Sequence, residues 1–239
     1  VNSIIEDSEG DLWYGTNNGI SLQESKTGKW HSYLSTFENV QNSKNHIFTT
    51  LCEVSPGIIW AGGYFSGIYQ IDKRTSKTTY FTPALYARED IRPDKYIRDI
   101  RKDSHGYIWT GGYYNLKRIN VQTKDIRLYH GLHSVTAIIE KDDKSMWIGT
   151  ATGLHLLDKE SGKFERIQLP VESTYIYSLY QTKKGSLYIG TSGSGVLIYD
   201  PQTKLFTHYY TGNCAMISNN IYTILSDAVS YTHLTLPTI

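Results

Sequence analysis

The chain has 239 residues, and its 24 Lys and Arg residues nearly balance its 23 Asp and Glu residues, which leaves a net charge of +1 at pH 7. This balance produces no overall field that favours nucleic acid or an anionic membrane surface, so neither is expected as a partner of these residues. No apolar run approaches the roughly 20 residues that span a bilayer, so membrane contact is expected only through segments outside this sequence.

Five copies of one short phrase recur along the chain. Each copy has a turn that contains glycine or another small polar residue, followed by a strand. The strand ends in an aromatic residue, here called the anchor, then one intervening residue and glycine. The anchors are Trp13, Trp60, Trp109, Trp147 and Tyr188, which by subtraction lie 47, 49, 38 and 41 residues apart. A period of about 40 residues indicates stacked supersecondary units.

Each unit is predicted to begin with a short strand and a tight turn. The first strands are rich in β-branched and aromatic residues and too short for ordinary helices; they cover residues 47–54, 97–100, 135–139 and 176–180. Glycine supplies the positive φ that tight turns need, and it follows these strands at Gly10, Gly57, Gly106 and Gly185. A second turn is expected at Gly19, Gly67, Gly153 and Gly195, with Asn115 taking the left-handed conformation in the third unit.

Third and fourth strands complete each unit. The third strands are predicted over residues 20–23, 68–72, 116–120, 154–158 and 196–200, and aromatic fourth strands such as 79–81 and 206–210 follow a polar turn. Four antiparallel strands per unit form the blade of a β-propeller. The predicted fold is therefore an all-β propeller of four-stranded antiparallel blades, incomplete, with five blades plus the first strand of a sixth at residues 221–225.

The recurring anchors are interpreted as core residues. A propeller blade buries large apolar side chains against both neighbours, and burying one aromatic ring stabilises the fold by roughly 2 to 3 kcal/mol. No anchor is therefore assigned a binding role.

The repeated phrase resembles the two-component regulator propeller repeat. Residues 4–20 and 138–154 follow its pattern best, and residues 199–225 resemble the join between two repeats. The second copy departs most, because its turn lacks Asp and Ala61-Gly-Gly replaces Ile-Gly-Thr, while the fifth has Tyr188 in place of Trp. The resemblance implies the periplasmic sensor region of hybrid two-component histidine kinase and response regulator proteins of Gram-negative bacteria.

That resemblance also implies partners. Many such proteins respond to oligosaccharides, so an oligosaccharide is the expected ligand. Other propeller domains and a sandwich domain of the parent chain are expected to contact this one, and the parent is expected to be a homodimer. The signal would pass to a histidine kinase that this sequence does not contain.

The expected domain boundary lies near the carboxyl end. Residues 1–227 are predicted to be propeller repeats, as a partial propeller truncated at both ends. Residues 228–239 lack the Gly and Trp that should follow. We expect this non-repeat tail to be a sequencing or assembly artefact.

No catalytic motif, cofactor site or metal site is predicted. His130 and His133 form a His-x-x-His pair without a third ligand at a telling distance, and Cys52 and Cys214 fit no metal spacing. One alternative is an enzyme that resembles streptogramin lyases, which are propellers with a His general base, for which His46 and His133 are the candidates. The other alternative is a propeller scaffold that binds protein partners.

The candidate binding residues lie on two turns and one long connection. The turns between the second and third strands carry Tyr64 and Phe65 in one blade and Tyr113 and Tyr114 in the next, and they should share one side of the propeller. The connection between these blades adds Tyr86, Arg88, Asp90 and Arg92. Aromatic faces beside Arg and Asp suit a sugar, particularly an acidic one. The same residue types also build contacts to a second propeller or a partner subunit.

Overall fold

The computed structural model describes residues 1–34, 47–81, 96–226 and 232–235, the last of these for the backbone only. The chain divides into two compact units, Val1–Gly131 and Leu132–Ile239, here called unit 1 and unit 2. All regular elements of the described residues are strands. Among them there is no helix with the length and hydropathy needed to cross a bilayer.

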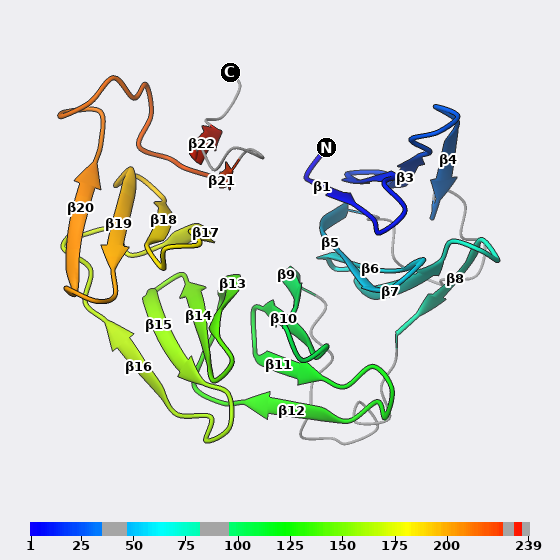
Figure 1. Cartoon of the computed structure of the whole chain (residues 1–239), viewed down its shortest axis with the longest axis horizontal. Coiled ribbons are helices and arrows are strands. Elements are labelled where there is room, and N and C mark those ends of the chain that lie inside the picture. Colours follow the sequence, from blue (N-terminus) through cyan, green and yellow to red (C-terminus); the bar gives the residue numbers. More distant parts are fainter. Residues whose placement is uncertain (35–46, 82–95, 227–231, 236–239) are drawn as a thin grey trace. The chain divides into compact units, whose positions relative to one another are not determined.

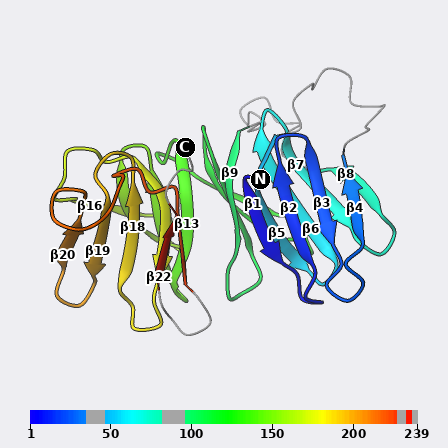
Figure 2. The same cartoon turned by 90° about the horizontal axis from the view of Figure 1, so that it is seen from above.

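Unit 1 contains three four-stranded antiparallel sheets, each built from strands consecutive in the chain (Figures 1 and 2). Each sheet follows the strand order predicted from the repeat, with the hairpin turns at the expected glycines except the second turn of the third sheet, which contains Asn115. The strands are β1 (Ser3–Glu6), β2 (Leu12–Thr16), β3 (Gly19–Gln23) and β4 (Trp30–Tyr33); β5 (Ile47–Ser55), β6 (Ile58–Tyr64), β7 (Gly67–Asp72) and β8 (Lys77–Tyr80); and β9 (Ile97–Lys102), β10 (Ile108–Gly112), β11 (Leu116–Ile119) and β12 (Ile126–Tyr129).

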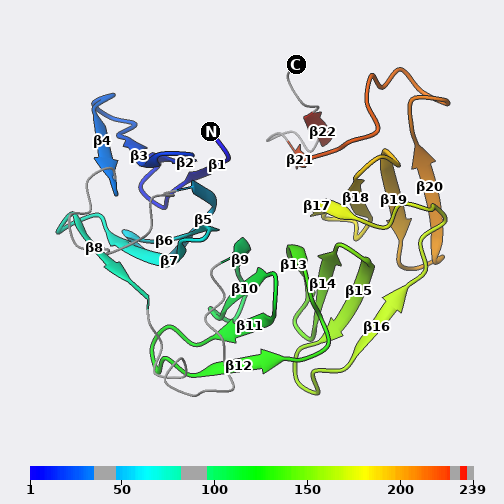
Figure 3. The same cartoon turned by 180° about the vertical axis from the view of Figure 1, so that it is seen from behind.

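Unit 2 contains two further four-stranded sheets and one two-stranded sheet (Figure 3). Its strands are β13 (Val135–Asp142), β14 (Ser145–Thr150), β15 (Gly153–Asp158) and β16 (Phe164–Ile167); β17 (Ile176–Gln181), β18 (Leu187–Thr191), β19 (Val196–Asp200) and β20 (Leu205–Tyr209); and β21 (Thr223–Ser226) with β22 (Thr232–Thr235). β21 overlaps the predicted first strand of a sixth blade, residues 221–225, and is displaced toward the carboxyl end.

Within each unit, the first strand of a sheet packs against the preceding sheet. β5 contacts β1, β2 and β3, and β9 contacts β5 and β6. In unit 2, β17 contacts β13 and β14, and β21 contacts β17 and β18. Sheets that stack through their first strands are propeller blades. The predicted all-β propeller fold of four-stranded antiparallel blades is therefore confirmed.

The turns obey the predicted glycine chemistry with one exception. Glycines of the first turns have φ between +76° and +93°, as at Gly57 and Gly185, and those of the second turns lie between +64° and +139°, as at Gly67 and Gly153. The prediction for Asn115 was wrong, since this residue is not among the described residues with positive φ. Three residues, 113–115, separate β10 from β11, whereas two separate β6 from β7, so Asn115 does not occupy the position that Gly67 takes in the two-residue turn.

The four Trp anchors are buried in the cores of their units, as predicted. Their indole N–H groups all donate hydrogen bonds, to Asp7 in the first blade (2.8 Å), Gln70 in the second (3.2 Å), Asp103 in the third (2.9 Å) and Gln181 in the fourth (3.0 Å). A buried donor without an acceptor would cost about 1 to 3 kcal/mol. Tyr188 differs, because it is only partly buried and packs beside Tyr180.

Residues 232–235 fall inside the predicted non-repeat tail. Their backbone pairs with β21 in antiparallel register, with Thr223 opposite Thr235 and Ser226 opposite Thr232. Backbone pairing does not test the origin of a sequence. The assignment of residues 228–239 to an artefact thus stays a prediction.

Candidate functional site: an aromatic surface on unit 1

The second blade carries two aromatic rings where β6 ends. Tyr64, the last residue of β6, pairs with Ile47 at the start of β5. A Cβ on Gly63 would lie 1.7 Å from the Ile47 carbonyl oxygen, so glycine alone permits this close approach. Phe65 follows in the turn with φ of +59°. The Gly-Gly that departs from the usual phrase therefore serves to bring Tyr64 and Phe65 beside the start of β5.

The third blade has a similar sequence at the same place, with Tyr114 where the second blade has Phe65. β10 ends at Gly112, and Tyr113 and Tyr114 occupy the turn before β11. The Tyr113 backbone N–H donates a hydrogen bond of 3.3 Å to the carbonyl oxygen of Tyr96, the residue directly before β9. This bond ties the turn to the entry of the blade's first strand.

Tyr96 joins the two turns. Its ring centroid lies 4.5 Å from that of Phe65, 6.3 Å from that of Tyr64 and 6.1 Å from that of Tyr113. Tyr113 and Tyr114 meet edge to face at 4.9 Å. These separations are those of favourable aromatic pairs. We call Tyr64, Phe65, Tyr96, Tyr113 and Tyr114 the aromatic surface.

The aromatic surface is accessible to a ligand. Phe65, Tyr113 and Tyr114 are 49%, 53% and 38% exposed, and Tyr64 and Tyr96 are partly buried. Neighbouring exposed aromatic rings are unusual outside interaction sites. Four of the five rings carry a phenolic hydroxyl, so the surface offers both ring faces and hydrogen-bonding groups.

A cation lies beside these rings. In β9, Asp99 pairs with Gly111 and Ile97 with Gly112, so Arg98 is the extra residue of a β-bulge. Bulges re-aim side chains. The Arg98 guanidinium carbon lies 5.4 Å from the centroid of the Tyr64 ring, which is a cation–π distance.

The structure thus brings together four of the eight predicted site residues, namely Tyr64, Phe65, Tyr113 and Tyr114. Tyr96 contacts rings of both turns, so the two turns lie close together in unit 1, and the binding role of these residues stays a prediction. Tyr86, Arg88, Asp90 and Arg92 lie outside the described residues, as does His46. His130 and His133 are both exposed and belong to different units.

Sequence reasoning missed Tyr96 and Arg98. A signal for Tyr96 is present, since Tyr175 stands in the same place directly before β17, where it contacts Tyr177 at 5.0 Å. Tyr177 is in turn the bulge residue of β17, as Arg98 is of β9. Comparing the residues directly before each first strand would have singled out Tyr96, whereas the bulge position of Arg98 follows only from the strand register.

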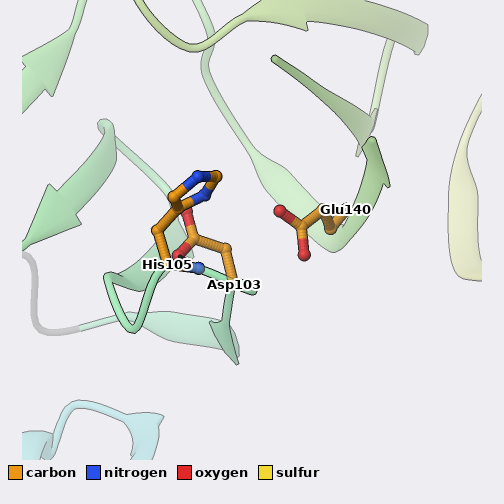
Figure 4. Close-up of side chains that lie close together, drawn as sticks. All are labelled: Asp103, His105 and Glu140. Atoms are coloured by element: carbon orange, nitrogen blue, oxygen red, sulfur yellow. Dashed lines mark hydrogen bonds between the residues drawn. The ribbon is translucent and has the colours of Figure 1, made fainter. Parts of the chain in front are cut away.

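The acidic turn of the third blade has a structural role. Asp103 Oδ1 accepts the backbone N–H groups of His105 at 3.1 Å and Tyr107 at 2.9 Å, and Oδ2 accepts the Trp109 indole. Figure 4 shows the side chains of Asp103 and His105. Glu140, also drawn in Figure 4, belongs to unit 2, where Lys159 is its ion-pair partner. Asp103 therefore closes its turn and satisfies a buried anchor.

Comparison with known proteins identifies the repeat. Residues 1–18 and 170–193 match the family described as "Two component regulator propeller". These segments contain the first-blade turn and anchor and the start of the fifth blade. The resemblance read from the repeated phrase is thereby confirmed. No curated protein matches the sequence at a significant level.

Solved structures share the fold at low sequence identity. The extracellular domain of BT4673 from B. thetaiotaomicron, named a one component system, has a TM-score of 0.74 at 20% identity over 98% of this chain and 36% of its own. That of BT3049 from the same organism, named a hybrid two component system, gives 0.65 at 17% over 98% and 38%. Virginiamycin B lyase from Staphylococcus aureus gives 0.73 at 16% over 94% and 73%. The chain thus spans little more than a third of the two extracellular domains.

Proposed function

Because the chain contains two component regulator propeller repeats, we propose that it is a sensing propeller from the extracytoplasmic region of a hybrid two-component sensor. Its ligand is an oligosaccharide, and ligand binding changes the activity of a kinase elsewhere in the parent protein. The aromatic surface of unit 1 is the contact site. The similarity to extracellular domains of two B. thetaiotaomicron proteins supports an extracytoplasmic location, and we propose the periplasm.

The observation that carries the ligand proposal is the aromatic surface. Five rings from two blades lie within 6.3 Å of a neighbouring ring, and three are exposed. Sugar rings present C–H faces that stack on aromatic side chains, while their hydroxyls need hydrogen-bonding groups of the kind that Tyr supplies. The surface meets both needs. It is built on strand ends fixed by glycine contacts, which limits the entropy lost on binding.

The test is direct binding by the purified chain. Wild-type protein is screened by titration calorimetry against oligosaccharides of several sugar types, and the best ligand is then measured with a Tyr64→Ala/Tyr113→Ala variant. Loss of each stacked ring should weaken binding by about 1 kcal/mol or more, so the double variant should bind at least about tenfold more weakly. Trp30→Ala is the matched control, because Trp30 is an aromatic residue of the first blade that is 54% exposed and lies on β4, away from these turns.

Binding that is unchanged in the double variant would remove the aromatic surface from the proposal. An absence of binding to every oligosaccharide would remove the sugar ligand.

In parallel, sequencing outward from the codons for Val1 and Ser226 tests the parent architecture. A reading frame that lacks a membrane helix and a kinase would contradict the sensor proposal.

A second candidate is a protein-contact role for the same surface. Interfaces favour Tyr, Phe and Arg, and the aromatic surface with Arg98 has that composition. Sedimentation of the wild-type chain and the Tyr64→Ala/Tyr113→Ala variant separates the two roles. A fall in association with no change in sugar binding favours protein contact.

Catalysis is the weaker candidate. Virginiamycin B lyase shares the fold at 16% identity, which carries no chemistry to this chain. His133 is exposed on unit 2. Incubation of the chain with a streptogramin B antibiotic, followed by mass spectrometry, tests for a linearised product. We propose that none forms.

A further inference from the structure

The bulge of β9 gives the aromatic surface a charge that its rings lack. Arg98 is held by its contact with Tyr64, 5.4 Å from guanidinium carbon to ring centroid. Stacking on a ring uses the flat face of the guanidinium and leaves its N–H edges pointing outward. Arg98 makes no hydrogen bond or ion pair within the described part of the chain.

The nearest acidic residue along the chain does not neutralise this cation. Asp99 forms an ion pair with Arg101, with Arg101 Nε 3.1 Å from Asp99 Oδ1. Asp99 is also buried, whereas Arg98 is only partly buried. Within the described residues, Asp99 is thus paired with Arg101, and the positive charge of Arg98 remains available beside the rings.

The second blade of unit 1 has a bulge at the corresponding position of its first strand, and this bulge carries a different residue. It holds Thr49 in β5, where the Thr49 hydroxyl donates to the Ile97 carbonyl oxygen at 3.1 Å. Thr is short and uses its hydroxyl within the fold. Arg98 instead places a long cation at a position whose geometry does not require one, so the fold itself does not explain it.

We infer that Arg98 makes the aromatic surface selective for acidic sugars, with a ring carboxylate or sulfate accepting the outward N–H groups. This inference rests on the proposed oligosaccharide function. The guanidinium edge matches the two oxygens of a carboxylate or sulfate, so two parallel hydrogen bonds form. Phe65 and Tyr113 contribute ring faces for the adjoining sugar. A neutral sugar would gain the stacking contacts and lose the charged pair.

Three galactose-based trimers distinguish the forms of the acidic group: a galacturonic acid trimer, a sulfated galactose trimer and the neutral galactose trimer. Their affinities are measured by titration calorimetry for the wild-type chain, Arg98→Gln and Arg98→Lys. We expect the wild-type chain to bind at least one acidic trimer about tenfold more tightly than the neutral one, because hydrogen bonds to charged groups are the stronger ones. Whichever acidic trimer binds more tightly identifies carboxylate or sulfate as the partner.

Arg98→Gln should abolish this preference, so that acidic and neutral trimers bind with affinities within about twofold of each other. Arg98→Lys should keep only part of it, since Lys cannot form the paired bonds. Equal binding of acidic and neutral trimers by the wild-type chain, or an acidic preference that survives in Arg98→Gln, overturns the inference and leaves the oligosaccharide function standing. Failure of all three trimers to bind overturns the inference, while the proposed function still depends on the wider sugar screen. Circular dichroism of both variants checks that the fold is retained.

Discussion

A Cβ added to Gly62 would lie 2.5 Å from Ile97 Cγ2, because the second and third blades of unit 1 meet at these two residues. The same relationship occurs in unit 2, where a Cβ on Gly149 would lie 2.7 Å from Ile176 Cγ2. Both glycines stand two residues after a Trp anchor, and both Ile residues are buried on the first strand of the next blade. Glycine in the repeated phrase thus sets the distance between neighbouring blades.

Gly62→Ala should therefore destabilise the fold through overpacking. The added methyl group meets Ile97 and also Ile100, so the blades must separate or Ile97 must leave its preferred rotamer. We expect the free energy of unfolding to fall by about 1 to 3 kcal/mol. Urea denaturation followed by Trp fluorescence measures it.

A double-mutant cycle with Ile97→Ala identifies the cause. If the clash is responsible, the combined variant should lose less stability than the two single variants together. Gly15→Ala provides a graded comparison, because its nearest contact is looser, 3.1 Å from the Phe48 carbonyl oxygen. Additive effects of Gly62→Ala and Ile97→Ala would contradict this explanation of the glycine.

The fold could be predicted from the sequence because its signals are local. The turn glycines, the alternating strands and the aromatic anchors all lie within one repeat, and their spacing is enough to specify a blade. The contact between Gly62 and Ile97 could not be predicted in this way, because it joins residues 35 positions apart (97 − 62) and depends on how two blades stack. The same holds for the Trp147 indole, whose acceptor Gln181 is on the next blade.

The candidate site was predictable only in part for a similar reason. Paired aromatics in two turns are visible in the sequence, and they led to Tyr64 and Tyr113. Tyr96 has a sequence counterpart in Tyr175, but its contacts with the rings of both turns follow only from the ring distances. Arg98 was missed because a β-bulge is a property of strand register, and neither strand shows it alone.

The two hydrogen-bonding modes of the Trp anchors predict different responses to Asp→Asn substitution. Asp103 accepts the Trp109 indole at Oδ2 and two backbone N–H groups at Oδ1. In Asp103→Asn, the amide NH₂ would face the indole donor, so a buried hydrogen bond is lost. We expect a loss of about 1 to 3 kcal/mol in the free energy of unfolding.

Asp142→Asn is the matched control in the fourth blade. Asp142 accepts the backbone N–H of Lys144, while the Trp147 indole bonds Gln181 instead. The change should alter stability by no more than about 0.5 kcal/mol. Equal losses in the two variants would show that the indole bond does not matter for stability.

Cys52 should react slowly with alkylating reagents at neutral pH. Burial raises the pKa of its thiol to about 11, while the charge of Arg101 lowers this pKa and the charge of Asp99 raises it. Since the thiolate is the reactive form, the alkylation rate of a Cys214→Ser variant should keep rising to about pH 10 or beyond, whereas a thiol with a pKa of about 8.5 would level off earlier.

The same shift predicts a fall in stability at alkaline pH. A folded-state pKa above the unfolded value means that the folded chain holds its proton more tightly, so this contribution is complete below about pH 8.5 and is lost as pH rises toward about 11. Cys52→Ala in the Cys214→Ser background should remove that part of the pH dependence. An alkylation rate of Cys52 that levels off near pH 9 in the folded chain would contradict the burial of this residue.

Lys73 ties the second blade to the acidic turn of the first. Its Nζ lies 2.7 Å from Asp7 Oδ2, 2.7 Å from Glu9 Oε2 and 2.6 Å from Asp11 Oδ2. The hydrogen bond from Lys73 is the main reason that the pKa of Asp11 falls to about 2. Burial alone would raise the pKa of Asp7, but bonds from Lys73 and Trp13 bring it below its ordinary value.

Lys73→Met leaves three carboxylates close together without their cation, two of them buried. We expect the free energy of unfolding at pH 7 to fall by about 3 kcal/mol, as when one partner of a buried ion pair is removed. Both aspartates have depressed pKa values, so their stabilisation is complete above the unfolded value of about 3.9 and is lost as pH falls toward about 2. The difference between wild type and Lys73→Met should therefore shrink below about pH 4. Lys26→Met, at an exposed lysine of the first blade, should have little effect on the free energy of unfolding at any pH. If the loss of stability in Lys73→Met does not change with pH, packing and not charge makes Lys73 stabilising.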